Sequence, residues 1–198
     1  MSTASPARHL VLALTGASGA PYASCFLNKA AQFPQLQLSI ILSRNAAQIW
    51  EMEVGAPLPQ APQWRYWDAR DFSAPFASGS HPADAMLILP CSMGTAGRIA
   101  QGISDDLIGR AADVQLKENR PLILVPRESP LNRIHLRNLS LLAEAGALIV
   151  PAAPSFYHQP RSLQELIEPF IDRLLYLCEA TESYTGPKWG DETHNKHF

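Results

Sequence analysis

The sequence has few cysteines, and their arrangement gives them no joint role. Its 198 residues include three, Cys25, Cys91 and Cys178, which are widely separated, odd in number and without a C-x-x-C pair. This pattern excludes a disulfide framework and a zinc site of the usual spacing. The six histidines are also scattered without ligand spacing. We therefore predict a chain that binds no metal and works in a reducing cytoplasm.

Long hydrophobic runs and a strong net charge are missing as well. No stretch approaches the ~18 apolar residues of a membrane-spanning helix, and residues 1–9 are too short and polar to suggest a secretory signal. A formal charge of −2 gives no reason to expect nucleic acid or an acidic membrane as a partner. With 46% apolar residues, the chain can bury one substantial core, so we expect one domain over residues 1–198.

Short apolar runs are present instead, each bounded by turn residues. We predict strands at 9–15, 36–42, 85–90, 121–126 and 147–150, with a candidate short strand at 64–67. The runs are continuous rather than alternating, which is typical of strands covered on both faces of a parallel sheet. Helices are expected between them, at 19–32, 44–53, 94–117 with a break at 102–104, 131–145 and 163–178. This alternation predicts a doubly wound α/β sheet.

Three regions need separate interpretation. Pro169 lies inside the last predicted helix and should kink it or delay its start, while Ser162 and Glu165 have capping-box spacing. Residues 55–84 form a long proline-rich connection, for which a surface excursion and a substrate lid are equally good interpretations. Residues 182–198 have no apolar period, so we expect a C-terminal arm that a neighbouring subunit orders.

In an open α/β sheet, ligands bind beyond the carboxyl ends of the strands. Small, hydroxyl-bearing and cationic residues follow the predicted strands: Gly16, Ala17, Ser18 and Gly19, then Ser43, then Ser92, Met93, Gly94 and Thr95, then Arg127 and Glu128, and lastly Tyr157 and His158. This composition is typical of a phosphate-binding edge. The first turn, G-x-x-G, matches neither a dinucleotide fingerprint nor a P-loop, and a tight turn alone explains its glycines equally well. The second turn strengthens the case, because Ser92 and Thr95 would cap a helix whose free N–H groups can hold a phosphate.

Charged residues further along the chain leave alternatives open. Arg110 and Lys117 are seven residues apart, hence on one side of a helix, and form either a solvated basic face or an anion site. Glu128 beside Arg127 is either a salt-bridge partner or an acid–base group. The Asp-Asp pair at 105–106 lacks the third aspartate of a magnesium diphosphate motif, so a helix cap is the preferred interpretation.

Three separated segments resemble the flavin prenyltransferase family. They are GASGAPYA at 16–23, CSMGT at 91–95 with RAADVQLKENRPLILVPRESPLNRIHLRNL at 110–139, and GALIVPAAPSFYHQP at 146–160. They occur in the family's order, and the resemblance covers about residues 9–178. It implies a Rossmann-like three-layer α/β/α sandwich with a mainly parallel sheet. It also implies a homo-oligomer, a dodecamer with sites where subunits meet.

The resemblance further implies a reaction and roles for individual residues. Family members join the dimethylallyl group of dimethylallyl monophosphate to N5 and C6 of reduced FMN, without a metal, and the prenylated FMN serves a partner decarboxylase. The anion at the turns would then be the phosphate of FMN. The positions implied to contact FMN are Gly16, Ala17, Ser18, Ser43, Ser92, Met93, Gly94, Thr95 and Arg127.

Other positions are implied to bind the prenyl phosphate or to act in the reaction. Tyr157 and Arg173, helped by Arg110 and Lys117, would hold the prenyl phosphate, and Lys117 would also take part in catalysis. The implied catalytic carboxylates are Glu128 and Glu53, the latter working with Ser18, while Glu51 competes for the role of Glu53.

Two other functions stay open. Decarboxylases of C-terminal or pantothenoyl cysteine share the fold, but the stretch corresponding to their P-A-S-A-N-T motif is Pro-Ala-Ala-Pro-Ser-Phe at 151–156. A non-catalytic FMN carrier would need the turns at Ser18 and Ser92 but would have no use for Glu128, Lys117 and the residues implied to hold the prenyl phosphate. Catalysis is therefore the preferred hypothesis.

Overall fold

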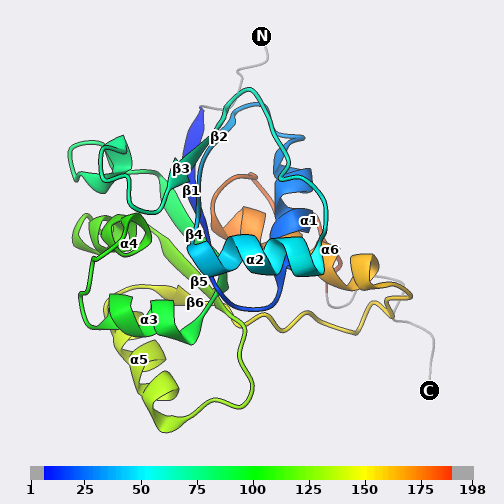
Figure 1. Cartoon of the computed structure of the whole chain (residues 1–198). Helices are drawn as coiled ribbons and strands as arrows, with labels where there is room; N and C mark the ends of the chain where they lie inside the picture. The colour runs from blue at the N-terminus through cyan, green and yellow to red at the C-terminus, as the bar shows by residue number, and fades with distance from the viewer. Residues whose placement is uncertain (1–6, 189–198) are drawn as a thin grey trace.

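Strands and helices alternate along the chain, as Figure 1 shows. The computed structural model describes residues 7–188. In chain order the elements are β1 (Arg8–Leu14), α1 (Ala20–Ala30), β2 (Leu36–Leu42), α2 (Arg44–Glu53), β3 (Trp64–Asp68), the 3₁₀ helix η1 (Pro75–Ala77), β4 (Ala85–Cys91), α3 (Met93–Ala100), α4 (Leu107–Lys117), β5 (Leu122–Pro126), α5 (Arg133–Glu144), β6 (Leu148–Ile149) and α6 (Leu163–Leu177). The predicted strands and helices are confirmed, and the expected break at 102–104 separates α3 from α4.

The six strands form one parallel sheet in the order β3-β2-β1-β4-β5-β6. After β1 the chain builds β2 and β3 on one side and then crosses to place β4 on the other side. The topological switch point therefore lies between β1 and β4, and ligands bind at such a crevice beyond the strand ends. The fold class is the predicted Rossmann-like α/β/α sandwich.

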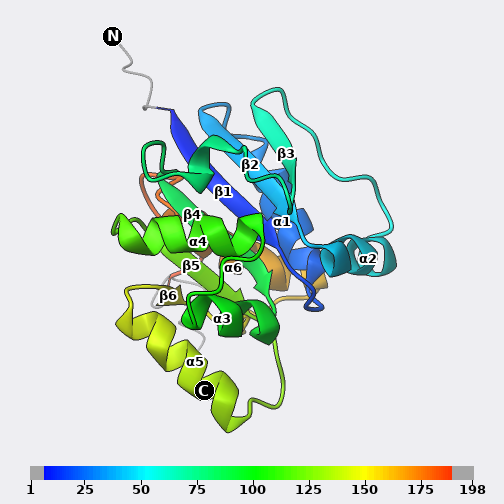
Figure 2. The same ribbon diagram turned by 60° about the vertical axis from the view of Figure 1, so that its left-hand side comes forward.

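Two apolar cores lie on opposite faces of the sheet, because successive strand residues point to opposite sides. Leu12 of β1 packs in one core with Phe26 of α1 and Ile171 of α6. Its neighbour Val11 packs in the other core with Ala111 of α4. Figure 2 shows α3, α4 and α5 together on one side of the sheet. Burial of both faces explains why the strands are continuous apolar runs.

Pro169 lies inside α6, which begins at Leu163 as predicted, so of the two effects expected of this proline the delayed start does not occur. The helix begins after Ser162, whose hydroxyl accepts the Glu165 N–H at 3.1 Å, while the Glu165 carboxylate accepts the Arg161 N–H at 2.7 Å. Pro169 has no N–H to offer the Glu165 carbonyl. His158 replaces it, with Nε2 at 3.0 Å from that oxygen. The loop before α6 is thereby tied to the first turn of the helix.

The connection at 55–84 is partly ordered by its own aromatic residues. Phe76 of η1 is buried, and its ring packs edge-on against Trp67 and His9. The C-terminal arm expected at 182–198 lies outside the described residues from position 189 onward. Among the helices within residues 7–188, none has the length and apolar content needed to span a membrane.

Candidate active site

The turns that leave β1, β2, β4 and β5 lie side by side at the carboxyl edge of the sheet. The Ser43 N–H donates to the Leu14 carbonyl at 3.0 Å, and the Arg127 N–H donates to the Cys91 carbonyl at 3.4 Å. These backbone hydrogen bonds link neighbouring turns. The predicted residues of the first turn, Ser43, the second turn at 92–95 and Arg127 are therefore brought to one edge, around the switch point.

The glycines of the first turn are required by its geometry. A Cβ on Gly16 would lie 2.7 Å from the Cβ of Asn45, in the first turn of α2, and no real pair of such atoms comes so close. Gly19 has a φ of +127°, which favours glycine. The tight-turn interpretation is therefore correct for both residues, and it explains how α2 approaches the turn.

The carboxylate of Glu53 occupies the N-terminus of α1. Its Oε2 accepts the N–H groups of Gly19 and Ala20, each at 2.8 Å, and the Ser18 hydroxyl donates to the same carboxylate. These are the free N–H groups that a helix N-terminus offers to an anion. In this structure the chain's own carboxylate, rather than an external anion, accepts these two N–H groups.

Arg127 completes a group that we call the Ser18 cluster: Ser18, Glu53 and Arg127. The Arg127 Nε donates to the Ser18 carbonyl at 2.7 Å. Desolvation would raise the pKa of Glu53, but the hydrogen bonds from Ser18, Gly19 and Ala20 and the charge of Arg127 lower that pKa overall. The cluster thus keeps an ionised carboxylate beside the hydroxyl that donates to it.

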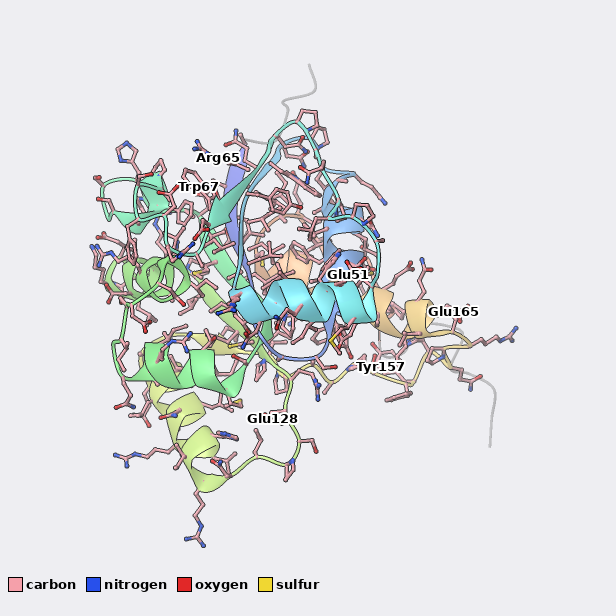
Figure 3. All side chains as sticks on the ribbon, viewed as in Figure 1. Glu51, Arg65, Trp67, Glu128, Tyr157 and Glu165 are labelled. Carbon is pink, nitrogen blue, oxygen red and sulfur yellow. The ribbon has the colours of Figure 1, made fainter. Side chains whose placement is uncertain are left out.

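Helix α2 carries both carboxylates that compete for the Glu53 role. The helix begins after Ser43, whose hydroxyl accepts the Ala46 N–H at 3.2 Å, and it ends at Glu53. Glu51 is exposed, and Figure 3 shows it on the outer part of α2. The residue that reaches Ser18 is Glu53, which separates the two candidates.

The second turn combines a buried hydroxyl pair with an open helix end. Ser92 caps α3, as predicted: its hydroxyl accepts the Thr95 N–H at 3.3 Å and lies 3.0 Å from Thr95 Oγ1. Thr95 and Met93 are buried, so the Thr95 side chain holds Ser92 rather than facing solvent. Gly94 is exposed, and a Cβ there would meet no atom within 4 Å. The first N–H groups of α3, which have no acceptor within the helix, are therefore approachable.

Glu128 lies on the loop that leaves β5, as Figure 3 shows, and its side chain is exposed. Its Oε1 accepts the N–H of Ser129 at 2.9 Å. Among residues 7–188, no basic side chain forms a salt bridge with it. Glu128 therefore forms no salt bridge within the described part of one protomer, which leaves the acid–base interpretation open.

The Asp-Asp pair caps α4, as predicted. The Asp106 side chain accepts the Gly109 N–H at 2.7 Å, and Arg98 of α3 pairs with both Asp105 and Asp106 at 3.5 Å. Within residues 7–188, no group of three or more histidine, cysteine or acidic side chains is placed to hold a metal ion.

Arg110 and Lys117 lie on α4 and do not join the Ser18 cluster. Both border η1 or the residues just after it: Arg110 Nε donates to the carbonyl of Ala77, the last residue of η1, at 2.8 Å, and Lys117 fills the space that a Cβ on Gly79 would need. Lys117 pairs with Glu118. Because it ends α4 just before β5 begins, Lys117 lies toward the amino ends of the strands. One protomer does not bring it to the carboxyl edge.

Tyr157 and Arg173 meet at the segment 184–187. The Tyr157 hydroxyl donates to the Pro187 carbonyl at 2.9 Å, and the Tyr184 hydroxyl donates to the same oxygen at 3.2 Å. The Arg173 guanidinium lies 6.0 Å from the ring centre of Tyr184. Figure 3 shows Tyr157 on the loop before α6. The predicted pair is thus brought together, and Tyr184 joins it.

Sequence reasoning missed two residues that shape this region. Thr15 is a buried hydroxyl residue between the first turn and the second turn, and Tyr184 lies in the segment 182–198 that the sequence predicts to be a C-terminal arm. The signal for Thr15 was a hydroxyl at the end of an apolar run, directly before the glycine turn. Nothing local in the sequence marked Tyr184, because its neighbours come from a distant loop and from α6.

Comparisons with known proteins identify the family of this chain. A family model described as Flavoprotein matches residues 1–173. The flavin prenyltransferase UbiX of Synechocystis is 41% identical over 206 residues, which cover 93% of this chain and 100% of that protein.

Two solved structures are similar over most of their length. One is described as a dodecameric FMN-dependent UbiX-like decarboxylase from Escherichia coli O157:H7; it has a TM-score of 0.83 and 35% identity and covers 91% of this chain and 98% of its own. The other is AnUbiX (PadA1) in complex with FMN and dimethylallyl pyrophosphate, with a TM-score of 0.79, 36% identity and coverage of 91% and 99%.

Proposed function

Because this chain belongs to the flavin prenyltransferases within the flavoprotein family, we propose that it transfers the dimethylallyl group of dimethylallyl monophosphate to N5 and C6 of reduced FMN. The observation that carries the proposal is the Ser18 cluster at the switch point, next to the open N-terminus of α3. An oriented hydroxyl with an ionised carboxylate serves proton transfer, and a helix N-terminus serves a phosphate.

The flavin phosphate belongs at α3 rather than α1. Glu53 already uses the N–H groups of Gly19 and Ala20, and a second anion there would be repelled. The first N–H groups of α3 have no acceptor within the helix, Gly94 there is exposed with open space around it, and Ser92 adds a hydroxyl. The flavin ring would then extend toward Ser18, with Ser43 and the first turn along its side.

Departure of the prenyl phosphate without a metal requires cations and hydrogen-bond donors around it. Tyr157 and Arg173 supply one such group, and Arg110 and Lys117 supply another on α4. Because Lys117 lies toward the amino ends of the strands in its own protomer, a second copy of the chain would have to bring it to the site. A closed homo-oligomer, a dodecamer as described for the E. coli structure, provides such contacts.

Glu128 is the proposed acid–base group for the leaving phosphate. Its carboxyl is exposed, lies beside Arg127 in the chain and forms no salt bridge among the described residues, so it is available to give or take a proton. We further propose that the chain is one domain in the cytoplasm and that a partner decarboxylase receives the product. One continuous sheet and three free thiols support the first two points.

Incubation with reduced FMN and a prenyl donor under anaerobic conditions tests the proposal. We expect mass spectrometry to find a flavin heavier by one C5 unit with dimethylallyl monophosphate, and the diphosphate serves as a parallel donor. Reactions without donor, or with FAD in place of FMN, are the controls. Absence of the C5 adduct with both donors would overturn the proposal.

A decarboxylase is the second candidate, because the E. coli structure is described as one. It predicts release of CO₂ from an aromatic acid or a C-terminal cysteine peptide by the chain with FMN alone. Cys91, next to the second turn, offers no reactive thiolate for such chemistry, since burial raises its pKa to about 12. A carrier without catalysis predicts tight FMN binding and neither product.

A further inference from the structure

The two turns of the candidate site leave neighbouring strands at a point where the sheet can no longer hold them. Pairing between β1 and β4 ends at Ala13↔Ile88. Beyond it lies Pro90, which has no N–H to donate to β1. At this point one long backbone hydrogen bond, from the Thr15 N–H to the Pro90 carbonyl at 3.3 Å, joins the two strands, so a side chain is needed to fix the first turn firmly relative to the second.

A buried hydroxyl adds two shorter hydrogen bonds to that backbone link. Thr15 is 1% exposed, and its Oγ1 donates to the Pro90 carbonyl at 2.8 Å and accepts the Ser92 N–H at 2.7 Å. The Thr15 N–H also points at the Pro90 carbonyl, at 3.3 Å. The hydroxyl thus acts as donor and acceptor at once, to two backbone groups on the far side of the switch point.

The residues on either side of this link are those that the site uses. Thr15 directly precedes Gly16, at the start of the turn that leads to Ser18. Ser92 is the N-cap of α3, so its N–H sets where the open end of that helix lies. A shift of a few tenths of an ångström between the turns would move the phosphate donors relative to the Ser18 cluster.

We propose that Thr15 is a positioning residue for FMN, which locks the α3 phosphate site to the first turn through its side-chain hydroxyl. The inference rests on the proposed function, because it concerns how the same FMN site is built. Thr15 acts through Ser92 and Pro90 and does not touch the ligand, since its side chain is buried.

Thr15→Val tests this role, because valine keeps the shape and removes both hydrogen bonds. It leaves the Ser92 N–H without its acceptor and leaves the Pro90 carbonyl with only the backbone N–H of residue 15, so the second turn loses its side-chain tie to the first. We expect FMN affinity to fall about tenfold to a hundredfold. Thr15→Ser keeps the hydroxyl and should bind FMN within about threefold of the parent.

Ser39→Ala is the matched control. Ser39 is also a buried hydroxyl in the sheet, paired with His9 at 2.9 Å and Trp67 at 3.3 Å, and it lies opposite Val11, well before the turns. Its loss should lower the free energy of unfolding without changing FMN affinity. Isothermal titration and flavin fluorescence, well below the melting temperatures of all variants, give the dissociation constants.

Each outcome bears on a different claim. A parent protein that does not bind FMN overturns the proposed function. A parent that binds FMN, with Thr15→Val equally tight or Thr15→Ser as weak as Thr15→Val, overturns the role of Thr15 alone.

Hydrogen exchange in the ligand-free parent provides a test that needs no variant. The Ser92 amide should be protected, whereas the exposed Gly94 amide should exchange fast. Equally fast exchange at both amides would also overturn the role of Thr15, even if Thr15→Val does not fold.

Discussion

Glu53 illustrates how one side chain can settle what a motif leaves open. A glycine turn that enters a helix offers N–H groups to any anion, and the sequence cannot say which anion is present. In the structure, Glu53, the last residue of α2, fills that position. Its carboxylate is held there by the Gly19 and Ala20 N–H groups and also accepts the Ser18 hydroxyl. This is why we propose that the FMN phosphate binds at α3, the other helix N-terminus at the switch point.

Replacement of Glu53 by glutamine should slow prenylation strongly. The amide keeps the shape but loses the charge and the proton-accepting oxygen, so we expect product formation to fall about a hundredfold. Glu51→Gln, two residues away on the same helix, should change the rate less than about twofold. Single-turnover formation of prenylated FMN, with both ligands saturating, measures the two variants. Equal rates for both variants would remove Glu53 from the mechanism.

The same carboxylate should make the fold sensitive to acid. Its pKa is lowered in the folded state, so its stabilising effect is present above the unfolded pKa and is lost as the pH falls through the folded pKa. Between about pH 5 and pH 3, the parent should therefore lose more unfolding free energy than Glu53→Gln. Urea denaturation at each pH provides the comparison, and parallel losses would contradict the assignment.

Glu128 and Arg173 should affect different steps. Glu128→Gln keeps hydrogen bonding but removes the titratable proton, so both ligands should bind while the chemical step slows about a hundredfold or more. Arg173→Ala should leave FMN affinity nearly intact and weaken capture of the prenyl phosphate about tenfold to a hundredfold. Titrations with each ligand and single-turnover rates separate the two effects. A Glu128→Gln enzyme as fast as the parent would transfer the acid–base role to another group.

At the scale of elements, strands and helices were predictable because burial on both sheet faces leaves unbroken apolar runs. The start of α6 at Leu163 was also predictable, from the Ser162 cap. How the helix tolerates Pro169 was not, because the missing N–H is replaced by His158, which comes from the preceding loop. The choice between Glu51 and Glu53 also needed the structure. Residues two apart on a helix point to different sides, and only the packing of α2 against the first turn decides which side faces Ser18.

His158 should stabilise α6 only because Pro169 is present. His158→Ala leaves the Glu165 carbonyl without a donor and should cost about 1 kcal/mol of unfolding free energy. In a Pro169→Ala background the helix supplies its own N–H to that carbonyl, so the same histidine substitution should cost clearly less. Chemical denaturation of the four proteins gives the double-mutant cycle. Equal costs in both backgrounds would show that His158 acts elsewhere.

At the scale of the whole molecule, one protomer divides the predicted site into three groups. The Ser18 cluster and the α3 end lie at the carboxyl edge, Tyr157 and Arg173 lie at the segment 184–187, and the α4 cations lie beside η1 or the residues just after it. Within residues 7–188, no hydrogen bond or salt bridge joins the Ser18 cluster to Lys117, which pairs with Glu118. The residues of each group could be named from the sequence. Contacts between subunits could not be predicted, because they depend on surfaces built from several distant segments.

Co-assembly of two inactive variants tests whether the groups meet between copies. Lys117→Ala and Glu53→Gln should each be nearly inactive as pure oligomers. If Lys117 serves the Ser18 cluster of a neighbouring subunit, random mixing leaves about one site in four with both native residues. Oligomers that carry both variants, co-expressed with different tags and purified through both, should therefore recover about a quarter of the parent's prenylation rate.

A site shared between subunits and a site within one protomer predict different activities for this mixture. If Lys117 and Glu53 worked within one protomer, no subunit of the mixture would hold both, and activity would stay at the level of the pure variants. Oligomers of one variant carrying two tags control for the purification, and co-expression of Glu53→Gln with Glu51→Gln shows the rate when half of the subunits are fully competent. Recovery with the Lys117→Ala partner therefore requires a site shared across a subunit contact, and its absence would confine the chemistry to one chain.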